Sequence, residues 1–201
     1  MKLVERFLLE LARGWTHASR PTLRILGSTA LILQTDYIRG TKDSDVLRTA
    51  ELDEATSEKL LSLGGSKSPL AARWNHYLDI VPNGLPLLPH APKWHPLVLS
   101  DAPATLSFEV LDVVDVVVSK LKRFGENDRG DIDAMIERGL VSHASLVERF
   151  ESAIDDFSHD ARAEHLPRYI RNFNEVERDS LGVDESVIEL PDWIGAEVTG
   201  D

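Results

Sequence analysis

The stretch ILGSTALILQTDYIRGTKDSDVL, residues 25–47, carries the pattern on which the fold prediction depends. An apolar run at residues 23–26 predicts a short buried strand, and Gly27-Ser28 follows it directly. A helix is predicted to begin immediately afterwards and to include residues 29–34. Because a helix N-terminus presents free backbone N–H groups, the Gly27-Ser28 turn is a candidate phosphate-binding site. A Gly-Ser turn before a helix is also common where no ligand binds.

Two acidic residues near the end of this stretch share one predicted strand. Asp43 and Asp45 lie in a strand predicted for residues 43–49. Side chains two positions apart on a strand point to the same face, which places the two Cα atoms about 6 to 7 Å apart. Hard divalent cations prefer carboxylate oxygens, so the pair is a candidate metal site. The same spacing is also found in exposed turns that are rich in aspartate.

A third carboxylate, Asp79, lies inside an apolar strand predicted for residues 74–81. An unpaired aspartate in such a strand is costly, which favours a functional reason for its presence. If this strand lies beside the strand that carries Asp43 and Asp45, the three carboxylates converge. Such a group could hold two metal ions for in-line phosphoryl or nucleotidyl transfer.

Strand patterns dominate the first part of the chain, and helix patterns dominate the second part. This order predicts an α+β fold with helices gathered on one side of the sheet. We expect an α+β core at residues 1–111, a helical part at residues 112–182 and an acidic tail at residues 183–201. The remaining predicted elements are an opening helix that ends near Gly14, a helix at 53–63, a loop at 82–96, one or two strands within 98–110, and helices at 112–124, 131–138, 142–157 and 160–178, the last of them bent at Pro167.

The composition is that of an ordinary soluble globular protein, because 42% of the 201 residues are hydrophobic and 28% are charged. No apolar run approaches the roughly 20 residues that are needed to cross a bilayer. The N-terminal segment is typical of an amphipathic helix rather than of a signal peptide. The absence of cysteine excludes disulfides, a thiolate nucleophile and a cysteine-based zinc site. We therefore expect a cytoplasmic protein with no membrane partner.

The formal net charge is −12, from 22 basic and 34 acidic residues. Proteins that coat nucleic acid nonspecifically usually carry a basic domain, so this balance argues against such binding but allows a local basic groove. Six of the acidic residues, and no basic residue, lie within residues 183–201. We expect Trp193 in this tail to dock on the protein's own surface or on a partner, with the carboxylates near Arg168, Arg171 and Arg178.

The order of these motifs resembles the nucleotidyltransferase superfamily, whose fold is like that of polymerase β. In that superfamily a Gly-Ser or Gly-Gly turn precedes an Asp-x-Asp strand, and a further Asp follows on a later strand. A second group of residues resembles the motif K-x-x-R followed by (K/R)-D-x-x-D. That motif is found in the branch that contains the bacterial AbiEii and MenT toxins. The matching residues are Gly27-Ser28, Arg39-x-Thr41-x-Asp43-x-Asp45 and Asp79 for the first pattern, and Lys120-Leu121-x-Arg123 with Asn127-Asp128-x-x-Asp131 for the second.

The resemblance implies a mixed sheet flanked by helices, and an enzyme that moves a nucleotidyl group from a nucleoside triphosphate (NTP) to an acceptor. It implies that Asp43 and Asp45 bind Mg²⁺ or Mn²⁺, and that Asp79 completes the metal site or acts as a base. Lys120 and Asp128 are expected to face the nucleotide in a catalytic role. The nucleotide-binding residues that the resemblance implies are Gly27, Ser28, Arg39, Thr41 and Lys120.

Other interpretations of these residues remain open. Lys120 is also typical of a solvated lysine in a basic turn, and Asp128 of a residue that caps the next helix. Asn127 stands where the toxin branch more often has a basic residue. Which nucleobase the enzyme selects, and which acceptor it uses, therefore stay open. The toxin branch implies an RNA acceptor, such as the 3′ end of tRNA, and an antitoxin-like protein partner. The alternatives are a protein or small-molecule acceptor, and an inactive domain that serves as a binding or antitoxin-like module.

Overall fold

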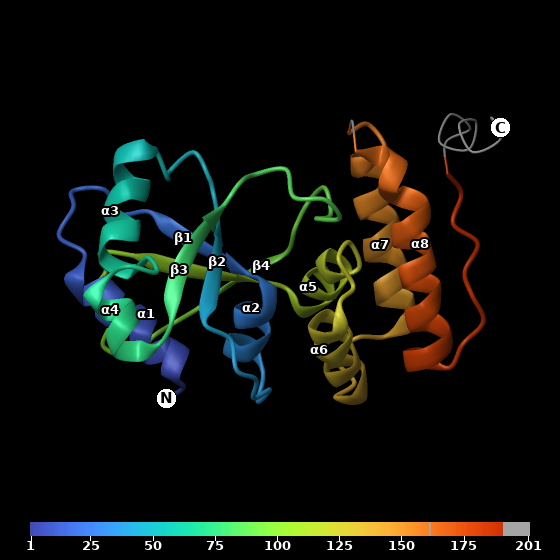
Figure 1. Ribbon diagram of the computed structural model, residues 1–201, viewed down its shortest axis with the longest axis horizontal. Coiled ribbons are helices and arrows are strands. Elements are labelled where there is room, and N and C mark those ends of the chain that lie inside the picture. The colour runs from blue at the N-terminus through green and yellow to red at the C-terminus, as the bar shows by residue number, and fades with distance from the viewer. Residues whose placement is uncertain (161, 191–201) are drawn as a thin grey trace. The chain divides into compact units, whose positions relative to one another are not determined.

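The strands of the computed structural model, which describes residues 1–160 and 162–190, form a five-stranded mixed sheet (Figure 1). They are β1 (Thr22–Leu26), β2 (Asp43–Leu47), β3 (Tyr77–Val81), β4 (Trp94–Pro96) and β5 (Ser107–Leu111). Their order in the sheet is β3-β2-β1-β5-β4. β1 is antiparallel to β2 and parallel to β5, β2 is parallel to β3, and β4 is antiparallel to β5.

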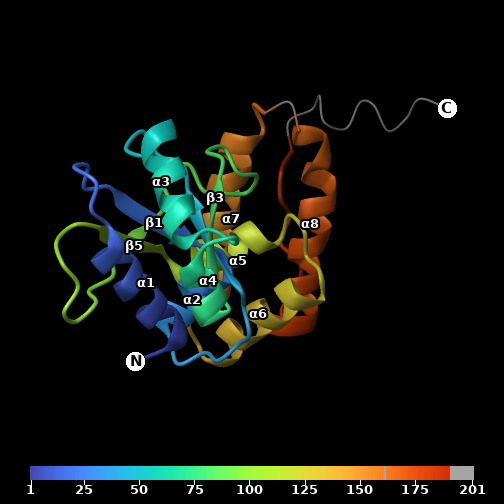
Figure 2. The same cartoon turned by 60° about the vertical axis from the view of Figure 1, so that its left-hand side comes forward.

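Helices cover the face of the sheet to which the apolar strand residues point (Figure 2). These helices are α1 (Leu3–Gly14), α2 (Gly27–Gln34), α3 (Glu54–Gly64) and α4 (Pro69–Trp74). Helices α2, α3 and α4 contact the strands, and α1 packs on all three of them. Burial alternates along the strands, so Val46 and Leu78 point to the helices while Asp43 and Asp45 point to the opposite face. The predicted α+β fold is confirmed.

The opening helix α1 forms where the sequence predicts it. Val4, Phe7, Leu8 and Leu11 recur at helical spacing, and all four are buried on one stripe of the helix. The helix ends at Gly14, as expected. This stripe supplies much of the apolar core between the helices and the sheet.

The chain before β3 is helical, which corrects the strand predicted for residues 74–81. Ser68 accepts a backbone hydrogen bond from the first turn of α4, and Pro69 occupies that turn, so both act as helix-start signals. Asn75 has a left-handed φ of 48° and ends the helix, and the strand therefore begins only at Tyr77. The alternating pattern begins at Trp74, but the strand begins three positions later because the helix signals outweigh the pattern there.

Two other strand expectations also need correction. The loop predicted for residues 82–96 contains the short strand β4, in which Trp94 pairs with Leu111 of β5. Pro96 is tolerated at its end because β4 lies at the edge of the sheet. Of the predicted strand region at residues 98–110, the part before β5 is irregular.

A second part of the chain is built from helices. These are α5 (Val113–Lys120), α6 (Glu126–Glu137), α7 (His143–Phe157), the 3₁₀ turn η1 (Ala163–His165), α8 (Leu166–Glu175) and the π-helical segment η2 (Val176–Leu181). Phe150 of α7 stacks on Phe173 of α8 with their ring centroids 4.3 Å apart. Pro167 lies in the first turn of α8, where proline is compatible with a helix, so a helix start replaces the predicted bend. Trp193 and residues 191–201 of the predicted tail lie outside the described residues.

The chain divides into two units by its internal contacts. One unit comprises Met1–Gly84 with Lys93–Asp112, and the other comprises Leu85–Pro92 with the helices from Val113 onward. The segment Leu85–Pro92 belongs with the helices because Arg149 of α7 donates to the carbonyl of Ala91 at 2.9 Å. Arg149 also donates to the buried carboxylate of Asp115 at 2.8 Å. In the described part of the chain, no helix is both long enough and apolar enough to span a membrane.

Candidate functional site

Three carboxylates lie on the face of the sheet opposite the helices. β2 and β3 pair in register, so Asp45 lies opposite Asp79, and Asp43 lies opposite Tyr77. Neighbouring strands are about 4.8 Å apart, and paired residues of parallel strands point to the same face. Asp43 and Asp45 are half-buried, whereas Asp79 is exposed. The three carboxylates therefore form one acidic strip along two adjacent strands.

The hydroxyl group of Tyr77 responds to the charge of this strip. The Asp43 carboxylate raises the pKa of Tyr77 above its ordinary value, and partial burial adds to the shift. Asp79 and Asp45 raise the pKa of this hydroxyl further. The cause is that a phenolate is disfavoured beside negative charges. A cation bound to the strip would relieve the same concentration of negative charge.

The strip does not form a complete metal cage by itself. Among residues 1–160 and 162–190, no group of three or more histidine, cysteine or acidic side chains is arranged to hold a metal ion. Mg²⁺ at phosphate-transfer sites is usually bound by one or two carboxylates, by waters and by substrate phosphates. Asp43 and Asp45 supply such a pair of carboxylates. The residues therefore fit a metal ion that binds together with a phosphate ligand.

The turn between β1 and α2 brings the backbone close to this pair. Gly27 has a left-handed φ of 69°, and a Cβ atom there would lie 2.9 Å from Oδ2 of Asp45. Any other residue at this position would be strained and would also press on that carboxylate. The N-terminus of α2 thus begins beside Asp45, and helix N-termini favour bound anions.

The loop before β2 connects the turn with the carboxylates. Arg39 Nη1 donates to Oγ of Ser28 at 2.8 Å, which places a guanidinium beside the start of α2. Thr41 Oγ1 donates to Oδ1 of Asp43 at 2.8 Å. A guanidinium in this position adds positive charge where a phosphate would bind. The structure therefore gathers, within one unit, the predicted site residues Gly27, Ser28, Arg39, Thr41, Asp43, Asp45 and Asp79.

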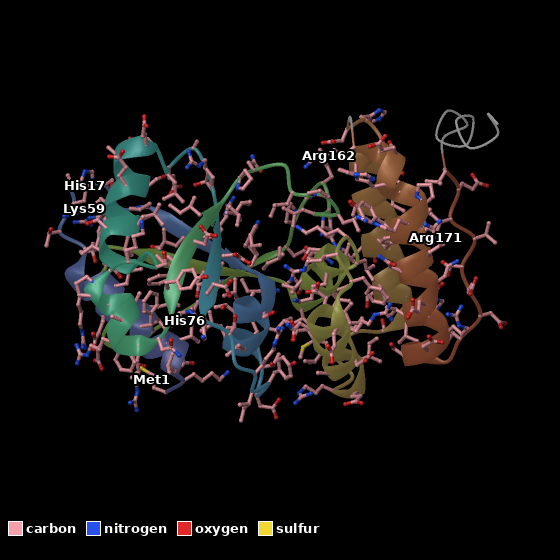
Figure 3. All side chains as sticks on the ribbon, in the orientation of Figure 1. Met1, His17, Lys59, His76, Arg162 and Arg171 are labelled. Atoms are coloured by element: carbon pink, nitrogen blue, oxygen red, sulfur yellow. The ribbon has the colours of Figure 1, made fainter. Side chains whose placement is uncertain are left out.

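A buried polar cluster of His76, Ser44 and Thr29 lies on the face of β2 that the helices cover. Figure 3 labels His76. The ring of His76 contacts Oγ of Ser44 through Nε2 at 2.7 Å and the carbonyl of Thr41 through Nδ1 at 3.2 Å. Thr29 Oγ1 donates to the carbonyl of Asp43 at 2.7 Å. Burial lowers the pKa of His76, and this effect outweighs the Thr41 carbonyl and the Asp43 charge, which both act to raise it. The imidazole is therefore neutral near pH 7.

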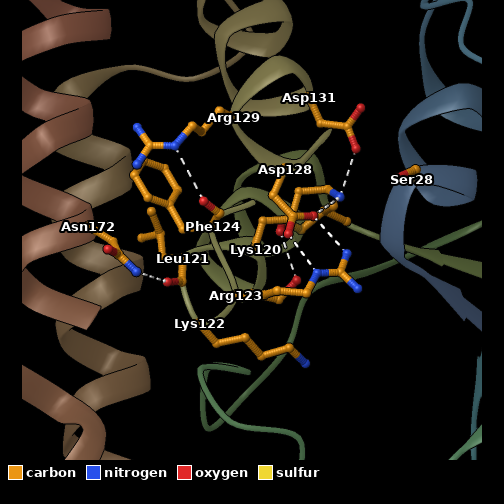
Figure 4. Close-up of polar contacts among 12 residues, drawn as sticks. Ser28, Lys120, Leu121, Lys122, Arg123, Phe124, Asp128, Arg129, Asp131 and Asn172 are labelled. Atoms are coloured by element: carbon orange, nitrogen blue, oxygen red, sulfur yellow. Dashed lines mark hydrogen bonds and ion pairs between the residues drawn. The ribbon is translucent and has the colours of Figure 1, made fainter. Parts of the chain in front are cut away.

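The residues of the later motif form a buried ion cluster in the helical unit (Figure 4). Lys120 Nζ lies 3.1 Å from Oδ1 of Asp128 and 2.7 Å from Oδ2 of Asp131, and the three side chains are 6%, 2% and 0% exposed. Arg123 donates to both carboxylate oxygens of Asp128, at 2.8 and 2.9 Å. Lys120 is thus a buried member of an ion cluster rather than a solvated lysine. The contact of Lys120 and Asp128 with a nucleotide stays a prediction.

The ion cluster makes Asp128 a stronger acid than an ordinary aspartate. Burial acts to raise the pKa of this carboxyl, but the hydrogen bonds from Arg123 and the charge of Lys120 outweigh burial and lower the pKa from 3.8 to about 2. Because the folded-state pKa is depressed, ionised Asp128 stabilises the fold above the unfolded-state pKa, and this stability is lost as the pH falls through the folded-state pKa. The shift corresponds to about 2 kcal/mol of unfolding free energy.

We therefore expect the stability advantage of the wild-type protein over Asp128→Asn to shrink by about 2 kcal/mol as the pH is lowered from roughly 5 to roughly 2. Denaturant unfolding at a series of pH values measures this difference. Asp101→Asn, at an exposed loop position with a left-handed φ of 65°, is the matched control. A difference between wild type and Asp128→Asn that does not change with pH would contradict the ionic role of this carboxylate.

Comparison with family models matches residues 8–181 to the family described as "Nucleotidyltransferase of unknown function (DUF6036)". The chain belongs to this family. The resemblance to the nucleotidyltransferase superfamily is therefore confirmed, and the toxin branch within it stays a prediction. No curated protein and no solved structure matches the chain.

Three residues around the acidic strip of this nucleotidyltransferase were not expected from the sequence. Tyr77 could have been found, because it lies two positions before Asp79 on the same strand. Ser44 could also have been placed, because it lies between the two aspartates and must point to the opposite face. His76 gave no local signal, because its two side-chain hydrogen bonds are to residues 32 and 35 positions away.

Proposed function

We propose that this nucleotidyltransferase uses Mg²⁺, or Mn²⁺, to transfer a nucleotidyl group from an NTP to an acceptor. The observation that carries the proposal is the position of Asp45. Its strand neighbour is Asp79, and its carboxylate lies against Gly27 at the start of α2. A carboxylate pair that suits a metal ion and a helix N-terminus that suits a phosphate are thus side by side, as the binding of a metal–triphosphate complex requires.

Each residue around Asp45 has a distinct task in this proposal. Asp43 and Asp45 would hold the metal ion, which neutralises phosphate charge when it is bound. The backbone N–H groups of Gly27 and Ser28 would bind the β and γ phosphates, with the Arg39 guanidinium beside them. When the acceptor oxygen attacks the α-phosphorus, pyrophosphate leaves and the acceptor proton must be removed. Exposed Asp79 could accept that proton.

We propose an RNA 3′ end, such as that of tRNA, as the acceptor, in keeping with the resemblance to the toxin branch. That branch also supports a toxin role in the cytoplasm and an antitoxin-like protein partner. The acidic net charge of −12 limits an RNA contact to a local basic surface.

An NTP labelled at the α-phosphate tests this proposal directly. The chain is incubated with Mg²⁺ and with separate pools of RNA, protein and small molecules, and the label is followed into each pool. We expect the α label to enter RNA, and a γ label to be released as pyrophosphate. Label in another pool would replace RNA with that acceptor class. No transfer and no metal-dependent NTP binding would instead identify an inactive binding module.

A further inference from the structure

We propose that His76 is a positioning residue that orients Asp43, acting through Thr41 and through the strand that carries Asp43. The inference rests on the proposed function in one respect, namely that Asp43 is a metal ligand. His76 itself is only 1% exposed, so solvent and substrate do not reach its ring. The ring is therefore not placed to act as a catalytic acid or base. His76 directly precedes β3 and lies beside α4 (Figure 3).

The two ring nitrogens of His76 hold two different parts of the chain. The carbonyl oxygen of Thr41 can only accept a hydrogen bond, so Nδ1, which lies 3.2 Å from that oxygen, must carry the hydrogen. In a neutral imidazole Nε2 then has the lone pair, so Ser44 Oγ donates to it at 2.7 Å. One ring therefore fixes the last part of the loop and the centre of the Asp-x-Asp strand relative to each other.

The position of the ring is itself fixed from the helix side. Phe7 of α1 meets His76 edge to face, with ring centroids 5.0 Å apart. The backbone N–H of His76 donates to the carbonyl of Ala71 in α4. Two helices therefore hold His76, one through its ring and one through its backbone, which makes it a rigid reference point for the loop that it contacts.

On the other face of the strand, the held loop reaches the Asp43 carboxylate. Thr41 donates its hydroxyl hydrogen to Oδ1 of Asp43 at 2.8 Å, and Thr29 donates to the carbonyl of the same residue at 2.7 Å. A hydrogen bond to an ionised carboxylate is stronger than one between neutral groups. His76 thus acts on Asp43 at one remove, by fixing the backbone from which the Thr41 hydroxyl is presented.

The test compares variants that remove these contacts with variants that restore them. His76→Ala removes both ring contacts, whereas the amide of His76→Gln can still donate and accept. Thr41→Val removes the hydroxyl with little change of shape, and Thr41→Ser restores it. The matched controls are His17→Ala and Thr16→Val, at adjacent exposed positions of the same unit.

Two readouts are needed, and both use the full chain. Mn²⁺ binding is measured through the electron paramagnetic resonance signal of the free ion. Circular dichroism first verifies that each variant is folded. We expect Thr41→Val and His76→Ala to weaken Mn²⁺ binding about tenfold, while Thr41→Ser, His76→Gln and the controls stay within about twofold of wild type. Amide hydrogen–deuterium exchange is measured without metal. Of all the variants, only His76→Ala is expected to exchange faster than wild type in residues 39–47.

The outcomes separate this inference from the proposed function. Unchanged exchange in residues 39–47 of His76→Ala, or equal Mn²⁺ affinity in Thr41→Val and wild type, overturns the positioning role. A loss of stability with unchanged metal affinity in the folded protein also overturns it, because that result describes a purely structural histidine. If wild-type protein binds no Mn²⁺, the metal site of the proposed function fails, and the exchange data alone decide whether His76 anchors the strand.

Discussion

Asp43→Asn is expected to reduce nucleotidyl transfer about a thousandfold or more while the protein remains folded. The metal ion contributes several kcal/mol to charge stabilisation in such reactions, and each 1.4 kcal/mol corresponds to about a tenfold change in rate. Asparagine keeps the shape of the side chain and can still accept the Thr41 hydrogen bond, but it loses the negative charge. Asp45→Asn is expected to have the same effect.

Stability and the tyrosine beside the strip provide independent readouts of the same variant. Without a metal, the removal of one of several like charges relieves repulsion, so the melting temperature should not fall. The pKa of Tyr77 should move back toward its ordinary value, because the Asp43 charge is the largest cause of its upward shift. Nuclear magnetic resonance titration of the tyrosines measures this change.

The matched control is again Asp101→Asn, which removes one carboxylate from an exposed loop of the same unit. It should keep wild-type activity and leave the Tyr77 titration unchanged. Full transfer activity in Asp43→Asn, with its fold intact, would show that the acidic strip is not the metal site.

Lys120→Ala is expected to destabilise the protein by about 3 to 5 kcal/mol. The side chain is 6% exposed and lies between the carboxylates of Asp128 and Asp131. Its removal leaves two buried negative charges with one cation fewer, and Arg123 contacts Asp128 from a side chain that is 75% exposed. Breaking a buried ion cluster from one side is costly because the remaining charge keeps its desolvation penalty.

Denaturant unfolding of Lys120→Ala and Lys122→Ala separates the cluster from its basic surroundings. Lys122 is half-buried two positions further along, and its loss should cost less than about 1 kcal/mol. The predicted contact of Lys120 with the nucleotide is measured on the same variants, as NTP affinity under conditions where both are folded. Equal effects of the two substitutions on stability would contradict the special position of Lys120, and equal effects on NTP affinity would indicate a diffuse basic surface.

The local features of the site could be predicted from the amino-acid sequence. The spacing of Asp43 and Asp45 places them on one face, because side chains alternate along any strand. The Gly27-Ser28 pair marks the turn at which a strand ends and a helix begins, and in the structure β1 ends and α2 begins there. The apolar periodicity of α1 and the change from strand patterns to helix patterns were sufficient for the α+β class. Each of these features is visible in the residue pattern of its own segment.

Which of these local features come into contact depends on how the whole chain packs. Asp79 lies beside Asp45 because β3 pairs in parallel with β2, and strand order and register depend on the packing of the whole sheet. His76 reaches Thr41 and Ser44 only after α4 replaces the first part of the predicted strand. The basic residues that follow Lys120 in the sequence are typical of an exposed surface. Lys120 is nevertheless buried, because two carboxylates of the next helix surround its ammonium group. The pairs Asp45–Asp79 and Ser44–His76 each join residues more than 30 positions apart, so no local pattern shows them and they follow from the folded structure alone.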